Sequence, residues 1–311
     1  MKKTVIAVVG PTAVGKTKLS IEIAKRFNGE IISGDSMQVY KGMDIGTAKI
    51  KKNEMQNIPH YMLDIKEPDE TFSAADFQFY VQEYIDAISE KKKLPIIAGG
   101  SGLYIQAALY DYNFSKQKKD HSLIAQLEKT IENEGIMPLY RRLKQIDPEQ
   151  ADRIHPNNHR RVIRAIEIHE TTGLTMSEYQ QQQNPEPPYN LLIIGLDMDR
   201  KLLYNRINQR IDAMMEEGLL KEVERLFQKG YENAQSMKAI GYKEFIPYLK
   251  GIQNLDESVE LLKRNSRRYA KRQYTWFRNK MDITWYKVTP DTINQEFKII
   301  LEDLEGFLNN M

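Results

Sequence analysis

The chain has 311 residues with 45 basic and 43 acidic side chains, a formal net charge of +2, and no cysteine. This length can bury a large core in one to three domains, and the composition is that of a globular protein. The lack of cysteine excludes disulfides, a thiolate zinc site and a cysteine nucleophile. The N-terminal apolar run superficially resembles a signal peptide, but it is short and leads directly into a loop that cleavage would destroy. No apolar run approaches membrane-spanning length, so we expect a cytoplasmic protein without membrane contacts.

The first motif is GPTAVGKT at residues 10–17, which fits the phosphate-binding pattern G-x-x-x-x-G-K-[ST]. A β-branched apolar run, residues 5–9, precedes it, and a run with helical periodicity, residues 18–27, follows it. In this context backbone N–H groups and the helix N-terminus face an anion. Lys16 adds positive charge, and the Thr17 hydroxyl can bind Mg²⁺. The motif does not distinguish a diphosphate from a triphosphate.

Strands and helices alternate through the first 113 residues. The sequence predicts strands at 31–33 and 60–65, a helix from Ser73 as N-cap, and a strand, glycine turn and helix within 94–110. This order predicts an α/β fold, a P-loop NTPase-like parallel sheet flanked by helices on both faces.

The pattern changes between residues 114 and 188, which are helical, rich in charge and glutamine, and without a strand pattern. We therefore predict an all-helical insertion domain at 114–188 between two parts of the core, 1–113 and 189–311. A proline-rich stretch, residues 184–190, marks its end. The second part of the core is expected to hold strands at 191–199 and 282–288 and helices at 201–229, 256–278 and 293–308, with Gly230 ending the first of these helices.

A basic segment lies in the second part of the core. Residues 263–280 carry eight basic and no acidic side chains, interleaved with aromatic residues, and a second basic cluster spans 157–164. Clustered positive charge with aromatic side chains is typical of nucleic-acid binding. A solvated helix face is the alternative interpretation of the same pattern.

Polar or glycine-rich sequences follow several predicted strands, where an open parallel sheet binds its ligands. Asp35 follows the strand at 31–33, where it could act as a general base, bind a metal, or simply cap a turn. Gly99 and Gly100 permit close approach of a ligand, and Ser101 supplies a hydroxyl group. An ATP hydrolase usually has an apolar strand ending in aspartate, and the best match here, Asp64, is weak.

Taken together, the motifs closely resemble the bacterial tRNA dimethylallyltransferases, also called isopentenyl-tRNA transferases. The resemblance covers nearly the whole chain and rests on GPTAVGKT, ISGDSMQVYKGMDIGTAK, PHYMLDI, SAADF, GGSGLYIQAAL, IHPNNHRRVIRAIE, RIDAMMEEGLLKEV, AIGYKEF and AKRQYTWFR. This chain departs from the family pattern at Ser101, where threonine is more usual, and at Asn158, where aspartate is more usual.

The resemblance implies transfer of a dimethylallyl group from its diphosphate to the exocyclic amine of the tRNA adenosine immediately 3′ of the anticodon, with Mg²⁺ as cofactor. It implies Asp35 as the catalytic base and Ser101 as a hydroxyl contact near the reacting centre. The implied diphosphate-binding residues are Gly10, Thr12, Ala13, Val14, Gly15, Lys16, Thr17 and Arg210, with Thr17 also as the metal ligand. The implied tRNA contacts are Asp35, Ser36, Met37, Gln38, His159, Arg160, Arg161, Lys271, Arg272 and Gln273. We expect a monomer whose helical insertion clasps the anticodon stem, with the adenosine flipped out of its stack.

Three other functions would use some of the same residues. A P-loop kinase of a small metabolite would place ATP in the loop and use Asp35 on the acceptor hydroxyl, but it gives no reason for the basic helix. A non-catalytic RNA-binding module with a nucleotide switch would not need Asp35. An enzyme that prenylates free adenine nucleotides would need neither the insertion nor the basic helix.

Overall fold

The computed structural model describes residues 2–112, 114, 120–182 and 186–310, and the chain forms two compact units. One unit combines Met1–Asp111 with Pro187–Met311, and the other is Tyr112–Glu186. The boundaries thus fall two residues before those predicted for the insertion, 114 and 188. Two residues of the proline-rich stretch, 184 and 185, lie outside the described residues.

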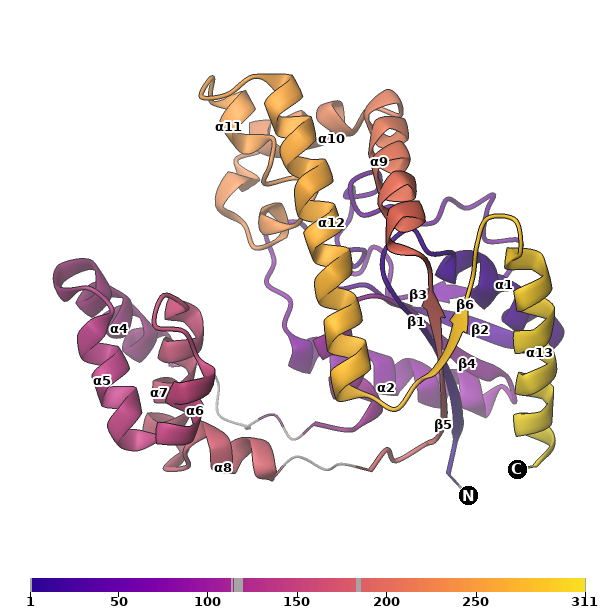
Figure 1. Ribbon diagram of the computed structural model, residues 1–311, viewed down its shortest axis with the longest axis horizontal. Helices are drawn as coiled ribbons and strands as arrows, with labels where there is room; N and C mark the ends of the chain where they lie inside the picture. Colours follow the sequence, from indigo (N-terminus) through magenta and orange to yellow (C-terminus); the bar gives the residue numbers. More distant parts are fainter. Residues whose placement is uncertain (1, 113, 115–119, 183–185, 311) are drawn as a thin grey trace. The chain divides into compact units, whose positions relative to one another are not determined.

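The first unit is built on a six-stranded sheet in the order β3-β2-β4-β1-β5-β6, and every pairing is parallel. The parallel sheet predicted from the strand–helix alternation is therefore confirmed (Figure 1). The strands are β1 Thr4–Val9, β2 Gly29–Gly34, β3 His60–Tyr61, β4 Leu94–Gly99, β5 Asn190–Asp197 and β6 Thr284–Lys287. The strand predicted at 60–65 is only two residues long, since Met62 and Asp64 adopt positive φ angles of 63° and 54° that end the extended conformation.

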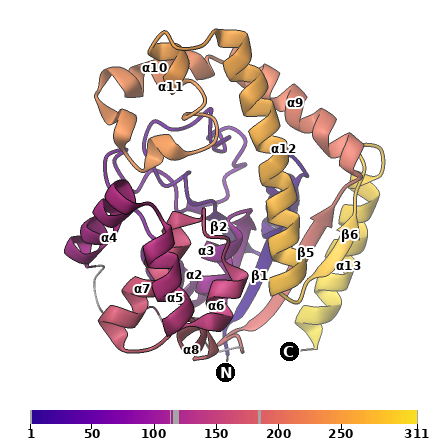
Figure 2. The same ribbon diagram turned by 60° about the vertical axis from the view of Figure 1, so that its left-hand side comes forward.

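Helices cover both faces of this sheet, with α1 and α13 on one side and α2 and α3 on the other (Figures 1 and 2). The helices of this unit are α1 Lys16–Arg26, α2 Ala74–Glu90, α3 Gly102–Leu109, α9 Arg200–Glu216, α10 Leu219–Gln228, α11 Ile246–Leu249, α12 Leu255–Lys280 and α13 Ile293–Asn309. Ser73 is the N-cap of α2, as predicted, and it forms a reciprocal capping box with Asp76. The helix predicted at 201–229 is interrupted at Gly218, where φ is 101°, and Gly230 follows its second half in the left-handed conformation.

The strand ends that carry the predicted site meet at one edge of the sheet. Val9 of β1 and Gly34 of β2 both pair with Gly99 of β4, so the loops after these three strands start side by side. The close approach explains the glycine at the end of β4, because a Cβ on Gly99 would lie 2.2 Å from the backbone of Gly34.

The second unit consists of helices throughout its described residues: α4 His121–Glu134, α5 Met137–Ile146, α6 Pro148–Arg153, α7 His159–Thr172 and α8 Met176–Gln181. Its own core includes Leu127, Leu143, Val162 and Ile166. Capping side chains mark the starts of α4, α6, α7 and α8, and Asn158 caps α7 by accepting a hydrogen bond from the Arg161 N–H.

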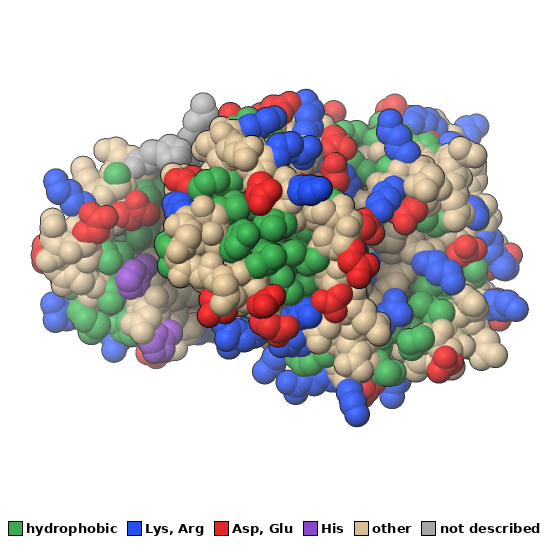
Figure 3. Space-filling view, turned by 90° about the horizontal axis from the view of Figure 1, so that it is seen from above, with side chains coloured by type: hydrophobic (Ala, Val, Ile, Leu, Met, Phe, Trp, Pro, Cys, Tyr) green, Lys and Arg blue, Asp and Glu red, His purple; other side chains and the backbone are tan. Residues whose placement is uncertain are grey.

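Neither unit has a helix in its described residues that is both long and apolar enough to cross a bilayer. Figure 3 shows basic and acidic side chains interspersed over the visible face, around a group of exposed hydrophobic side chains. On this face neither sign of charge dominates, so any basic bias has to be sought in particular segments.

Candidate functional site

The loop between β1 and α1 has the conformation of an anion cradle. Gly10, Ala13 and Gly15 all have positive φ, at 140°, 65° and 116°, and α1 begins at Lys16 without a side-chain cap. The N–H groups of the first turn of α1 are therefore open to a ligand anion, which the helix dipole also favours. A side chain at Gly10 would place its Cβ 2.7 Å from the Leu196 carbonyl oxygen, so glycine is required there.

Two arginines from α9 reach this loop. Arg206 donates from Nε to the Ala13 carbonyl oxygen at 2.9 Å, and Arg210 donates to the Thr12 hydroxyl at 3.4 Å. Together with Lys16 and Thr17 they line a cavity of about 470 Å³ on the outer side of the loop. Lys16, Arg206 and Arg210 thus converge where a diphosphate would sit, and of these three cations the sequence singled out Lys16 and Arg210.

Without a bound anion, the positive charges of this cluster destabilise the folded protein. Burial, followed by the charge of Arg210, lowers the pKa of Lys16 to about 7, while Asp35 acts in the opposite direction. Burial also lowers the pKa of Arg210. A phosphate anion would offset both effects, since opposite charge favours the protonated form.

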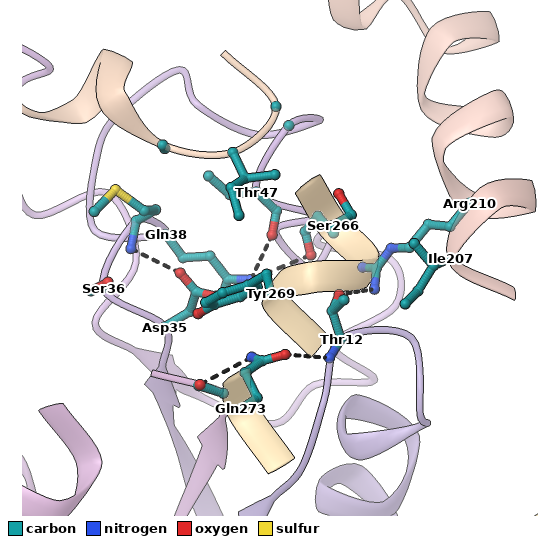
Figure 4. Close-up of a pocket in the computed structure, with 18 of the residues that line it drawn as sticks. Thr12, Asp35, Ser36, Gln38, Thr47, Ile207, Arg210, Ser266, Tyr269 and Gln273 are labelled. Atoms are coloured by element: carbon teal, nitrogen blue, oxygen red, sulfur yellow. Dashed lines mark hydrogen bonds between the residues drawn. The ribbon is translucent and has the colours of Figure 1, made fainter. Parts of the chain in front are cut away.

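A second cavity of about 370 Å³ lies on the inner side of the loop and shares Lys16, Thr17 and Arg210 with the first (Figure 4). One part of its wall is polar, from Asp35, Ser36, Gln38, Thr47, Ser266, Tyr269 and Gln273. Another part is apolar, from Ile207, Ile211, Met214, Ala239, Ile240 and Leu262. The combination suits a ligand with a phosphate end, a hydrocarbon portion and a polar partner.

Asp35 both caps a turn and faces the cavity. Its Oδ1 accepts a hydrogen bond from the Met37 N–H at 2.8 Å, which is the turn-capping alternative raised by the sequence. The same carboxylate lines the cavity, and burial raises its pKa even though Lys16 and Arg210 oppose the rise. A carboxylate that is more basic than usual in a cavity is a candidate general base.

Ser101 and Gln273 connect the loops around the cavity. The buried Ser101 hydroxyl accepts from the Ser36 N–H at 3.0 Å and so ties the glycine turn to the Asp35 loop. The Gln273 amide accepts from the Thr12 N–H and donates to the Gly100 carbonyl oxygen, both at 3.0 Å (Figure 4). Gln273 is 5% exposed, so here its side chain serves as a bridge, and the tRNA contact predicted for it stays a prediction.

The predicted RNA-binding residues otherwise lie mostly at the surface. Lys271 and Arg272 are exposed on α12, and Arg272 also lines the inner cavity. In the second unit, His159, Arg160 and Arg161 are exposed in the first turn of α7. Basic side chains at a helix N-terminus oppose the helix dipole, which suits a surface that meets an anionic partner.

Metal-binding side chains are sparse. Among the described residues no group of three or more histidines, cysteines or carboxylates could hold a metal ion. Asp64, the weak candidate for a nucleotide-hydrolase aspartate, follows β3 and pairs with Lys49 at 2.6 Å instead of lining either cavity. Thr17 is exposed and lines both cavities, so its hydroxyl group fits Mg²⁺ as one oxygen ligand beside phosphate oxygens.

Sequence reasoning gave no role to two residues that the structure places in the site. Tyr269 lines the inner cavity beside Gln273, and burial raises the pKa of its hydroxyl group well above the usual value. Arg206, one turn from Arg210, is the second of these residues. The aromatic spacing within the basic segment was the available signal for Tyr269, and the i, i+4 spacing was the signal for Arg206.

Comparisons of this chain with a family model and with named relatives identify the same family. The model of the family described as IPP transferase matches residues 38–280. A tRNA dimethylallyltransferase of Oceanobacillus iheyensis is 61% identical over 308 residues, which cover 99% of this chain and 98% of the relative. The tRNA dimethylallyltransferase of Anoxybacillus flavithermus is 53% identical and is covered over 100% of both chains.

Solved structures agree. The crystal structure of a tRNA isopentenylpyrophosphate transferase from Bacillus halodurans superposes with a TM-score of 0.75 at 48% identity, covering 99% of this chain and 98% of that chain. A eukaryotic dimethylallyltransferase acting on tRNA superposes with a TM-score of 0.81 at 32% identity, covering 93% of this chain and 75% of that chain.

Proposed function

The chain belongs to the IPP transferase family, the tRNA dimethylallyltransferases, and from this premise we propose how its two cavities carry out prenyl transfer. The enzyme transfers a dimethylallyl group from dimethylallyl diphosphate to the exocyclic amine of the adenosine immediately 3′ of the anticodon in tRNA. Diphosphate is the other product. The observation that carries the proposal is a single phosphate loop whose cations face a partly apolar cavity containing Asp35.

The loop holds the departing diphosphate. As the bond between the allylic carbon and its oxygen breaks, negative charge develops on the diphosphate. The N–H groups of the first turn of α1, together with Lys16 and Arg210, lie where that charge appears and stabilise it. Arg206, fixed to the loop by its bond to Ala13, adds a third positive charge at the outer side.

The dimethylallyl tail lies against the apolar wall of the inner cavity. Ile207 and Ile211 project from α9, and Leu262 projects from α12. These side chains exclude water from an allylic carbon that carries positive character, so that the adenine amine is the nucleophile that reaches it.

Asp35 takes the proton from the adenine amine. The amine is a weak nucleophile because its lone pair is delocalised into the ring, so a base must remove a proton as the carbon–nitrogen bond forms. The raised pKa of Asp35 makes it a better proton acceptor than an exposed aspartate. Ser101 holds the Asp35 loop through the Ser36 N–H, which fixes the base relative to the glycine turn.

Mg²⁺ would be held by the Thr17 hydroxyl and by oxygens of the diphosphate. When bound, the ion would neutralise charge on the leaving group. The scarcity of carboxylates around Thr17 in the described residues fits an ion that is ligated largely by substrate and water.

The adenosine has to leave its stack to reach the cavity, as single-stranded loop bases do. Lys271 and Arg272 on α12 and the basic first turn of α7 supply positive charge for the RNA backbone. We further propose that the protein acts as a monomer, and membership of a family that modifies tRNA supports a cytoplasmic location.

The test is incubation of the protein with labelled dimethylallyl diphosphate, Mg²⁺ and unmodified tRNA, with AMP as an alternative acceptor and ATP as an alternative donor. Label should appear in tRNA alone. Phosphorylation of an acceptor by ATP without prenylation of tRNA would favour the kinase, and label in AMP alone would favour the nucleotide prenyltransferase.

A further inference from the structure

A buried carboxylate outside the two cavities organises the wall of the inner one. Glu222 of α10 is 7% exposed, and no ion pair involves it within the described part of the chain. Its Oε2 accepts the N–H groups of Asp44 and Ile45, each at 3.0 Å. Its Oε1 accepts the Gly46 N–H at 3.0 Å and the Tyr242 hydroxyl at 2.7 Å. Four donors thus compensate one desolvated charge.

These four donors belong to two segments that border the inner cavity. The segments are residues 44–48 and 238–242, which we call the roof segments, and 46–48 and 238–241 within them contribute to the lining of the cavity. The two roof segments pack closely against each other, since a Cβ on Gly46 would lie 2.5 Å from the Tyr242 ring. A Cβ on Gly241, which has a φ of 101°, would lie 3.0 Å from the Gly46 carbonyl oxygen. The position of one roof segment therefore determines that of the other.

Hydrogen bonds continue from the roof to the proposed base. The Gln38 amide nitrogen donates to the carbonyl oxygens of Thr47 and Ala48 at 3.1 and 3.4 Å. The Gln38 amide oxygen accepts from the Ser33 hydroxyl at 2.8 Å, and that hydroxyl accepts from the Asp35 N–H at 3.3 Å. Figure 4 shows Gln38 between Thr47 and Asp35. Displacement of the roof would therefore reach the turn that aims the carboxylate.

We propose that Glu222 is a positioning residue for prenyl transfer, which holds both roof segments and, through Gln38, fixes the turn that carries Asp35. The inference rests on the proposed function. Only a carboxylate offers acceptors to all four donors, because an amide in its place would turn an NH₂ group toward backbone N–H groups. The role is one of geometry, so its loss should appear in turnover more than in tRNA affinity.

The test compares Glu222→Gln with Glu30→Gln. Glu30 is a matched control, because it is 2% exposed, accepts hydrogen bonds from Lys91, Lys93 and Tyr61, and lines neither cavity. Thermal melts give the folded fraction of each variant, and steady-state assays below both melting temperatures give kcat and the KM values. Both variants should melt earlier than the unchanged protein. Only Glu222→Gln should lose kcat per folded molecule, by about 10- to 100-fold, because small displacements of catalytic groups have effects of that size.

Tyr242→Phe keeps the test decisive if Glu222→Gln does not fold. It removes one hydroxyl group and leaves the ring against Gly46, and it should lower kcat by less than Glu222→Gln while leaving tRNA affinity unchanged. The inference is overturned if folded Glu222→Gln matches Glu30→Gln in kcat, or if Tyr242→Phe turns over like the unchanged protein. Absence of prenyl transfer by the unchanged protein is a separate result, since it would reject the proposed function itself.

Discussion

Replacing Lys16 with methionine should stabilise the free protein while abolishing its activity. The pKa of Lys16 falls from 10.5 to about 7, chiefly through burial, and each pKa unit corresponds to about 1.4 kcal/mol. The protonated side chain therefore destabilises the folded state by at most about 5 kcal/mol. Loss of the charged hydrogen bond to the Pro11 carbonyl oxygen, at 2.6 Å, removes about 1.5–3 kcal/mol. Solvent screening of this half-buried group reduces the remainder, and we expect a net gain of about 1–2 kcal/mol.

The sign of the pH dependence is fixed by the same pKa. Between pH 7 and 10.5 the unfolded chain binds more protons at Lys16 than the folded chain does, so the stability of the unchanged protein rises with pH in that window. Lys16→Met should lack this rise, so its advantage shrinks as the pH approaches 10.5.

Urea denaturation at several pH values measures both effects. The matched control is Lys25→Met, which makes the same change at an exposed position of α1 and should alter the stability little. Added inorganic diphosphate should stabilise the unchanged protein more than Lys16→Met, since a ligand stabilises the state that binds it. The reasoning is refuted if Lys16→Met is no more stable than the unchanged protein at pH 7 and shows the same pH dependence. Burial of the protonated Lys16 side chain would then not destabilise the folded protein.

Three further outcomes test the site. Asp35→Asn should retain tRNA affinity and lower kcat by about 10²- to 10⁴-fold, which is the range for a lost general base. The activity of the unchanged protein should fall as the pH drops through the raised pKa of Asp35. Unaltered turnover of Asp35→Asn would contradict the role of Asp35 as the base. Arg210→Ala should weaken the binding of inorganic diphosphate, measured by calorimetry, by about tenfold or more. Arg206→Ala should weaken it less, because the Nε of Arg206 is already bound to the loop backbone. If Arg206→Ala had the larger effect, Arg206 would be the main diphosphate contact. Lys271→Ala should reduce the slope of log binding constant against log salt concentration for tRNA by about one unit. The control Lys298→Ala, on α13, should leave this slope unchanged. Equal slopes in the two variants would remove Lys271 from the phosphate contacts.

Local sequence determined much of the fold and part of the site. The phosphate loop was predictable because its glycines, its lysine and its flanking strand and helix are contiguous in the chain. The position of Asp35 was predictable because the carboxyl ends of parallel strands meet at one edge. The short length of β3 was not predictable, because Met62 and Asp64 have positive φ and end a stretch whose sequence has the pattern of a longer strand.

Contacts between distant segments were the part that the sequence could not supply. Gln273 lies in a basic run that indicates RNA binding, yet its amide joins the phosphate loop to the glycine turn. That outcome depends on which face of α12 is turned toward the sheet. The buried face of α12 is uncharged but only partly hydrophobic, because it alternates Ser258, Ser266 and Gln273 with Leu262, Ala270 and Phe277, and its signal in the sequence is therefore weak. Glu222 likewise reads as one more acidic residue of an amphipathic helix until the loop that it binds is placed beside it.

The choice between phosphoryl and prenyl transfer depends on residues far from the phosphate loop. The loop alone would suit ATP equally well, because it contacts only the phosphates. What lies beyond the phosphates is a wall of aliphatic side chains from α9 and α12, including Ile207, Ile211 and Leu262. Such a wall offers no hydrogen-bonding partner to a nucleoside hydroxyl acceptor, but it buries a branched hydrocarbon favourably, at about 25 cal/mol per Å². Asp35 stands at the polar side of the same cavity, so the donor carbon and the base are brought together only when both ends of the chain have folded.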